Sequence, residues 1–206
     1  MLDIRTVTSP TLDENCYIIN YNDKIIIIDT SISVEELKKY KVNKVDYILL
    51  THAHFDHILT LNEIEHKYNS YIYCSKQAID KIYDDSHNLS KYFGKSLKID
   101  IDKSKINYTN NIKINDLEID VLNTPGHSNC SVCYVIKSEK IVFTGDTLFK
   151  KSVGRSDLYS GNAFDLNKSL KLLSTLDKDY TIYPGHGEIS SIEFEIKQNP
   201  YLKSLK

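Results

Sequence analysis

Five short strand-like runs in this chain are each followed closely by a histidine or an aspartate. The runs cover residues 25–28, 45–50, 117–122, 140–144 and 180–183. Runs of this length, rich in isoleucine, valine, leucine and tyrosine, are typical of strands. Loops at strand ends are where active sites are commonly assembled. We therefore expect sheets whose strand ends carry the chemistry of the protein.

The remaining pattern indicates how the strands are organised. Residues 16–19 and 24–28 flank a turn and predict a hairpin, and Ser33 has capping-box spacing for a short helix that follows it. Further strands are expected at 106–108, 111–114 and 132–136, helices from 58 to 68, at 75–83 and at 164–176, and a long polar loop at 84–104. Two strand-rich stretches, each followed by helix, predict two packed sheets with helices outside, in one domain spanning 1–206.

Composition excludes several classes of protein. The 206 residues carry a formal net charge of −2, which gives no basic surface for nucleic acid or an anionic membrane. The longest apolar run, residues 25–28, is far shorter than the ~20 residues of a membrane span. The N-terminus lacks a basic region followed by an apolar core, so we expect a cytoplasmic protein. The sequence leaves the oligomeric state open.

Residues 51–57 read Thr-His-Ala-His-Phe-Asp-His and hold three of the seven histidines. Imidazole and carboxylate groups at this density are typical of a hydrolytic metal centre. Alternate residues of an extended backbone face the same side, so His52, His54 and Asp56 can converge. A helix beginning at His57 would turn that side chain inward as well. The segment is therefore predicted to supply ligands to two metal ions.

Three further residues occupy glycine-containing loops after strands. His127 follows Thr-Pro-Gly, Asp146 follows Phe-Thr-Gly and His186 follows Tyr-Pro-Gly. Taken alone, each histidine would be an ordinary loop residue, and Asp146 a turn or capping residue. Their presence in the same chain as the 51–57 segment favours metal binding instead.

The other potential ligands are assigned no metal. His66 lies on the face of its helix away from the apolar residues, and His87 lies in the polar loop without a partner motif. The four cysteines are Cys16, Cys74, Cys130 and Cys133, and we expect them to be reduced. The Cys-x-x-Cys at 130–133 opens a strand-like run, whereas a redox pair is expected at a helix start, so a redox or metal role is the less favoured alternative.

Four segments together resemble the metallo-β-lactamase superfamily, and specifically its compact glyoxalase II-like (hydroxyacylglutathione hydrolase-like) branch. They are Thr-His-Ala-His-Phe-Asp-His at 51–57, Thr-Pro-Gly-His-Ser at 124–128, Phe-Thr-Gly-Asp-Thr-Leu-Phe at 143–149 and Tyr-Pro-Gly-His-Gly at 183–187. They occur in the family's order, and the resemblance covers essentially the whole chain. It implies an α+β fold, a four-layer αββα sandwich with the active site at one edge.

The resemblance also implies the ligand set. His52, His54 and His127 would hold one metal, Asp56, His57 and His186 would hold the other, and Asp146 would bridge them. The ligands suit two divalent ions, with zinc expected and iron or manganese accepted by the same donors. Such a pair activates a bridging hydroxide for attack on an acyl carbon, with Asp56 and Asp146 as the catalytic carboxylates. Asp29 would accept a hydrogen bond from a ligand histidine and fix its tautomer.

Residues 153–158 and the C-terminal end help to predict the substrate. Val-Gly-Arg-Ser-Asp-Leu at 153–158 resembles a segment shared by compact glyoxalase II-like hydrolases and persulfide dioxygenases. Arg155 either contacts substrate or pairs with Asp157, and Lys150 either attracts an acidic thiol carrier or belongs to a solvated surface. Longer glyoxalase II enzymes add a glutathione-binding helical region. We expect the stretch after residue 193 to leave no room for it, which weakens a specific assignment to glutathione thioesters.

The predicted function is hydrolysis of a small-molecule thioester, such as S-lactoylglutathione or a related acyl-thiol. The alternatives are a persulfide dioxygenase with a single iron, a hydrolase of another ester or amide, and a metal-binding domain without catalysis. The complete set of seven ligand positions argues against the dioxygenase and the non-catalytic domain. A true β-lactamase usually has a cysteine among its ligands and is exported, and nucleic-acid-processing members carry a large inserted domain, so neither is expected.

Overall fold

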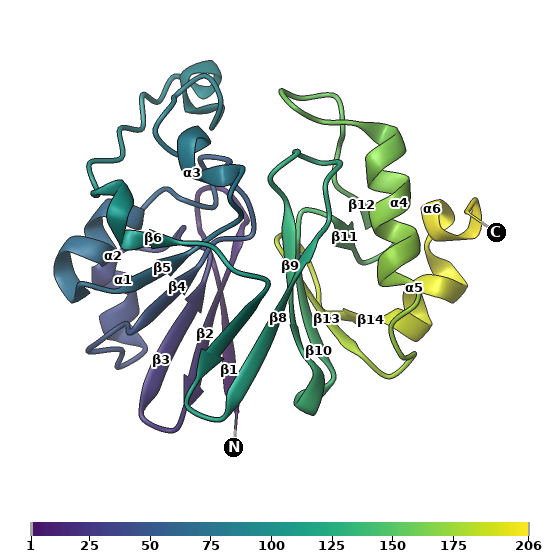
Figure 1. The fold of residues 1–206 in the computed structure, drawn as a ribbon, viewed down its shortest axis with the longest axis horizontal. Helices are drawn as coiled ribbons and strands as arrows, with labels where there is room; N and C mark the ends of the chain where they lie inside the picture. The colour runs from purple at the N-terminus through teal and green to yellow at the C-terminus, as the bar shows by residue number, and fades with distance from the viewer. Residues whose placement is uncertain (1, 206) are drawn as a thin grey trace. The chain divides into compact units, whose positions relative to one another are not determined.

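The computed structural model describes residues 2–205, which form two compact units that meet in the chain between Tyr108 and Thr109 (Figure 1). Each unit is built on one six-stranded sheet with helices packed on it. The prediction of a single domain stays a prediction, and each unit is described by itself. No helix of the described residues is long and apolar enough to cross a membrane.

The sheet of the first unit has the strand order β1-β2-β3-β4-β5-β6. Its strands are β1 (Asp3–Thr8), β2 (Asn15–Tyr21), β3 (Lys24–Ile28), β4 (Tyr47–Leu49), β5 (Tyr71–Tyr73) and β6 (Ile106–Asn107). The predicted hairpin is confirmed as antiparallel β2 and β3, while β3 to β6 run parallel. Ile26, Ile27 and Ile28 are fully buried, as is typical of a parallel strand covered on both faces.

Short helices connect the strands of the first unit. The predicted cap of α1 (Val34–Lys39) is confirmed, because the Ser33 hydroxyl accepts a hydrogen bond from the Glu36 backbone amide at 3.1 Å. The others are α2 (Leu61–Tyr68), α3 (Ala78–Lys81) and the 3₁₀ turns η1 (Ser90–Phe93) and η2 (Lys103–Lys105). The segment 84–104 is otherwise irregular, as its polar composition predicts.

The sheet of the second unit has the order β14-β13-β10-β9-β8-β7. Its strands are β7 (Asn111–Ile114), β8 (Leu117–Asn123), β9 (Val132–Ile136), β10 (Ile141–Gly145), β13 (Thr181–Pro184) and β14 (Ser190–Ser191). All neighbours are antiparallel except β10 and β13, which run parallel. A separate ribbon pairs β11 (Leu148–Phe149) with β12 (Ser152–Val153).

Three helices cover one face of the second sheet (Figure 1). They are α4 (Ala163–Leu173), α5 (Ile192–Gln198) and α6 (Pro200–Lys203). The apolar face of α4 places Leu166, Leu170 and Leu173 in a core with residues of β9, β10 and β13. Burial of this stripe explains why the 3.6-residue spacing in the sequence predicts α4 correctly.

Several boundaries differ from the sequence prediction. No helix begins at His57, because residues 55–57 form turns and α2 starts only at Leu61. The helix expected at 75–83 is reduced to α3, and β1, β5, β11, β12, β14, α5 and α6 were not predicted. The unpredicted strands are two-residue pairings, the three-residue β5, and β1, an edge strand with mostly exposed side chains. Such elements depend on a neighbouring strand more than on their own residues.

The core of the second unit gives a test of the packing. Replacing the fully buried Leu170 with alanine removes apolar contacts and leaves a cavity, so we expect a loss of about 2–5 kcal/mol in the free energy of unfolding. Leu172 lies on the same helix and is 42% exposed. Leu172→Ala should change this free energy by less than about 0.5 kcal/mol. Chemical denaturation measures both, and equal losses would contradict the packing described.

Candidate metal centre

The first unit supplies a cluster of histidines in the loop after β4. His52 and His54 are buried, and His52 Nε2 lies 3.1 Å from His54 Nδ1. The imidazoles of His52 and His57 are also in contact, with ring centroids 4.1 Å apart. Asp56 is partly exposed, and its Oδ2 lies 3.8 Å from His57 Nε2. All four predicted ligands of the 51–57 segment therefore lie together.

The carboxylate of Asp29 fixes this segment. Asp29 follows β3 directly and accepts hydrogen bonds from the Thr51 backbone amide and hydroxyl, both at 2.7 Å. Its Oδ2 also lies 2.7 Å from His57 Nδ1, so the imidazole donates its Nδ1 proton to the carboxylate. The His57 lone pair is thereby placed on Nε2. Asp29 therefore accepts the predicted hydrogen bond from a candidate ligand histidine.

A second carboxylate beside His57 was not predicted. Glu14 is completely buried, and its Oε1 lies 3.6 Å from His57 Nδ1. The sequence gives no signal for it, because Glu14 precedes a strand in a polar stretch and belongs to no motif. Burial, together with the charges of Glu14 and Asp29, raises the pKa of the neighbouring Cys16 thiol well above its usual value.

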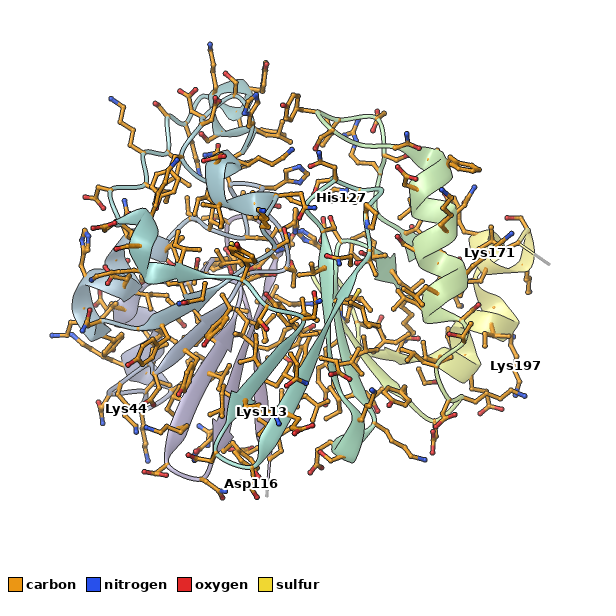
Figure 2. All side chains as sticks on the ribbon, viewed as in Figure 1. Lys44, Lys113, Asp116, His127, Lys171 and Lys197 are labelled. Carbon is orange, nitrogen blue, oxygen red and sulfur yellow. The ribbon has the colours of Figure 1, made fainter. Side chains whose placement is uncertain are left out.

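In the second unit, His127 lies beyond β8 at the end opposite the turn between Lys113 and Asp116 (Figure 2). It is buried, and its Nδ1 donates a hydrogen bond of 2.7 Å to the backbone carbonyl of Arg155. This contact selects the tautomer with the lone pair on Nε2.

The parallel neighbours β10 and β13 bring two further candidates beside His127. The Gly185 amide donates to the Gly145 carbonyl at 2.8 Å, which joins the loops that end these strands. Asp146 Oδ2 lies 3.5 Å from His127 Nε2 and 3.8 Å from His186 Nε2. Asp146 is buried and His186 is partly exposed. Three strand ends thus deliver the three predicted ligands of this unit to one place.

The donors of both clusters suit a transition metal. Two ligands bound at ~2.0–2.1 Å in a tetrahedral arrangement lie about 3.3 Å apart. The closest pairs described, at 3.1 Å between His52 and His54 and 3.5 Å between His127 and Asp146, are near this spacing. His57 and His127 each donate Nδ1–H to a fixed oxygen and direct the other nitrogen away, as metal-bound imidazoles do.

The loop at 153–158 lies directly on the ligands of the second unit. A Cβ atom on Gly154 would come within 1.8 Å of the Asp146 carbonyl oxygen, so only glycine fits this approach. Arg155 forms the predicted pair with Asp157, through two hydrogen bonds of 2.7 Å. Lys150 pairs with Glu188, and both line an open hollow of about 520 Å³ beside His186.

The remaining candidates lie apart from the metal ligands. His66 is about half exposed and lies 3.2 Å from Asp100, and His87 lies 3.3 Å from Asp84. Neither belongs to a group of potential ligands among residues 2–205. Cys130 and Cys133 are buried and reduced, and burial raises the pKa of Cys133 to about 12. A thiol in this state is a poor nucleophile, which argues against the redox alternative.

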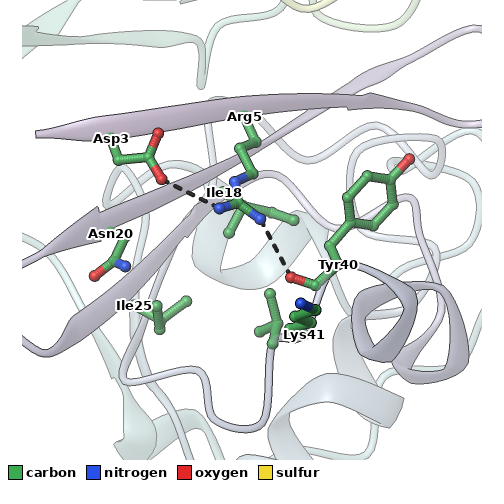
Figure 3. A pocket seen from close by; sticks show the side chains of 8 residues that line it. Asp3, Arg5, Ile18, Asn20, Ile25, Tyr40 and Lys41 are labelled. Carbon is green, nitrogen blue, oxygen red and sulfur yellow. Dashed lines mark hydrogen bonds and ion pairs between the residues drawn. The ribbon is translucent and has the colours of Figure 1, made fainter.

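Another cavity, of about 250 Å³, contains none of the candidate ligands (Figure 3). It lies between the outer strands of the first sheet and the end of α1. Arg5 reaches across it, with one nitrogen 3.5 Å from Asp3 and another 3.4 Å from the Tyr40 carbonyl. The cavity has no part in the chemistry of the histidine clusters.

The Arg155–Asp157 pair makes a prediction about pH. Hydrogen bonds from Arg155 lower the pKa of Asp157 to about 2, so the pair stabilises the loop at neutral pH and is lost as the pH falls through that value. Arg155→Ala should raise the Asp157 pKa toward ~3.9. Carboxyl-resolved NMR titration measures this pKa. Arg5→Ala removes the only other arginine and should leave it unchanged, and an unshifted pKa in Arg155→Ala would contradict the pairing.

Residues 10–186 match the family model of the metallo-beta-lactamase superfamily. The chain is 32% identical over 202 residues to a probable metallo-hydrolase, YqgX of Bacillus subtilis, with 94% of each chain covered. It is 26% identical over 211 residues to the hydroxyacylglutathione hydrolase GloC of Haemophilus influenzae, covering 98% of this chain and 99% of GloC.

Two solved structures are similar over nearly their whole length. The BLEG-1 B3 metallo-beta-lactamase superposes with a TM-score of 0.89 at 28% identity, covering 98% of this chain and 99% of that one. TTHA1623 in a di-iron-bound form superposes with a TM-score of 0.85 at 28% identity, covering 96% and 100%. The predicted α+β class and fold family are therefore confirmed.

Proposed function

Because the chain belongs to the metallo-β-lactamase superfamily, a family of metal-dependent hydrolases, we propose that it is a dinuclear enzyme that hydrolyses thioesters. The observation that carries the proposal is the fixed tautomer of two buried histidines. His57 is held by Asp29 and His127 by the Arg155 carbonyl, so each directs Nε2 as a metal ligand would.

The proposed ligands follow the family pattern. His52, His54 and His127 hold one ion, Asp56, His57 and His186 hold the other, and Asp146 contributes to both. Zinc suits these nitrogen and oxygen donors, and iron or manganese is accepted by the same set. The di-iron form of TTHA1623 is an example of iron in a similar protein.

The residues of this chain have distinct tasks in the proposed reaction. When bound, the two ions supply a hydroxide at neutral pH and stabilise the charge that develops on the acyl oxygen. Asp29 orients His57 and holds its proton on Nδ1, so that Nε2 is left to act as a ligand, and the Arg155 carbonyl orients His127 in the same way. Asp56 and Asp146 neutralise the charge of the ions and orient the attacking group. No serine or cysteine nucleophile is required.

Two observations support a thioester as substrate. GloC, which is similar over essentially the whole chain, is named a hydroxyacylglutathione hydrolase. The hollow beside His186 is lined by Lys150, Lys151 and Glu188, and its two cations outnumber its one carboxylate, which would favour a negatively charged group on the thiol carrier. S-lactoylglutathione and related acyl-thiols are therefore the first substrates to test.

Ligand removal tests the proposed chemistry. We expect His54→Ala or Asp146→Ala to lower kcat/KM for the best thioester by more than about a hundredfold, since loss of a mere hydrogen-bond partner of a ligand already costs about 10- to 100-fold. Metal content per chain should fall in the same variants while circular dichroism stays unchanged. His66→Ala removes an exposed histidine and serves as the control. Full activity in either ligand variant would refute the assignment.

A substrate panel on protein of known metal content separates the alternatives. Turnover of S-lactoylglutathione or of a thioester without glutathione supports the proposal and identifies the carrier. One iron per chain with oxygen consumption on glutathione persulfide would instead show a dioxygenase. Opening of a β-lactam with no thioesterase activity would place the protein with BLEG-1 in function as well as fold.

A further inference from the structure

The loop at 88–97 places an exposed aromatic ring against the metal-ligand segment of the first unit. Phe55 stands in the chain between His54 and Asp56 and is only 5% exposed. Its ring packs against Phe93, with centroids 4.9 Å apart and planes at 34°. Phe93 itself is 60% exposed. The ring of Phe93 therefore extends the buried ligand segment to the surface.

Buried polar residues hold this loop in place. The Phe55 amide donates to the Asn88 carbonyl at 2.8 Å, and the Asn88 side chain accepts from the Ser90 amide at 2.9 Å. The Ser90 hydroxyl accepts from the Leu97 amide at 3.1 Å, and both Asn88 and Ser90 are completely buried. Because these bonds order the backbone on both sides of Phe93, its ring is exposed in a defined position.

A positive charge accompanies the aromatic pair. Lys95 is exposed, and its Nζ lies 6.0 Å from the centre of the Phe55 ring. Among residues 2–205 no carboxylate lies within ion-pair distance of Lys95. The surface thus offers an apolar face and a cation whose charge is not neutralised by a neighbour.

On the basis of the proposed function, we propose that Phe93 and Lys95 form the surface with which the enzyme selects its substrate. The favoured substrate is a thioester with an apolar acyl group, which packs on Phe93, and an anionic thiol carrier, one charged group of which lies near Lys95. A large exposed ring costs free energy in water, and covering it with substrate recovers that free energy. The defined position of Phe93 keeps the ordering cost of binding low.

Four thioesters test the two contacts separately. They are the acetyl and benzoyl thioesters of glutathione, which is anionic, and of N-acetylcysteamine, which is neutral. We expect Phe93→Ala to reduce the preference for benzoyl over acetyl by about tenfold, chiefly through KM, and Phe93→Tyr to restore it. Lys95→Gln should reduce the preference for glutathione by about two- to fivefold, and less at high salt.

Matched variants separate recognition from folding. Tyr71 is 62% exposed and stacks on Tyr47 at 5.6 Å, so Tyr71→Ala removes a comparable aromatic pair in the same unit. Lys98→Gln removes another exposed lysine of the same segment. Neither control should change the preferences. Metal content and thermal unfolding should match those of the wild-type protein in both Phe93 variants.

Binding of S-benzylglutathione, a thioether that cannot be hydrolysed, gives a readout independent of activity. Calorimetry should show binding that Phe93→Ala weakens by about tenfold. Wild-type turnover with unchanged preferences and binding in the variants would overturn this inference and leave the proposed function standing. Binding that depends on Phe93, without turnover of any thioester, would refute the proposed function and leave the Phe93 binding surface standing. A wild-type protein that binds no S-benzylglutathione would also overturn the inference.

Discussion

The carboxylate of Asp29 is the interaction on which the ligand segment of the first unit depends. It joins the end of β3 to Thr51 through two hydrogen bonds and orients His57 through a third. Asp29 adopts a left-handed backbone conformation with φ of 59°, which aspartate tolerates better than most residues. Replacing it would lose a turn, a loop anchor and a histidine tautomer together.

The second unit positions its candidate ligands by a different arrangement. Its ligands are not close in sequence, and the parallel pairing of β10 with β13 brings Asp146 and His186 together. The Arg155 carbonyl then orients His127, and Gly154 allows the chain to approach Asp146 closely enough to do so. The Arg155 carbonyl therefore orients a histidine here, as the buried Asp29 carboxylate does in the first unit.

In the proposed function, recognition of the substrate falls to parts of the chain outside the candidate ligand loops. Lys150 borders the hollow beside His186, and Phe93 and Lys95 stand on the loop that covers Phe55. The loop of Phe93 and Lys95 is ordered by hydrogen bonds to the buried Asn88 and Ser90. Variation in such loops would change specificity without disturbing the candidate metal ligands, which lie at the ends of the sheet strands.

The sequence by itself predicted the candidate ligand residues and the strand runs that carry them, and its four motifs pointed to the family, because a dense set of histidines and aspartates at strand ends has few other uses. Apart from Asp29, which the sequence predicts, only the tertiary structure decided which groups lie against those histidines. Glu14 and the Arg155 carbonyl come beside their histidines only in the folded chain. Neither belongs to a sequence motif that would predict the contact. The turn at His57 was predicted as a helix for the same reason, since its geometry comes from bonds to distant Asp29 rather than from local propensity.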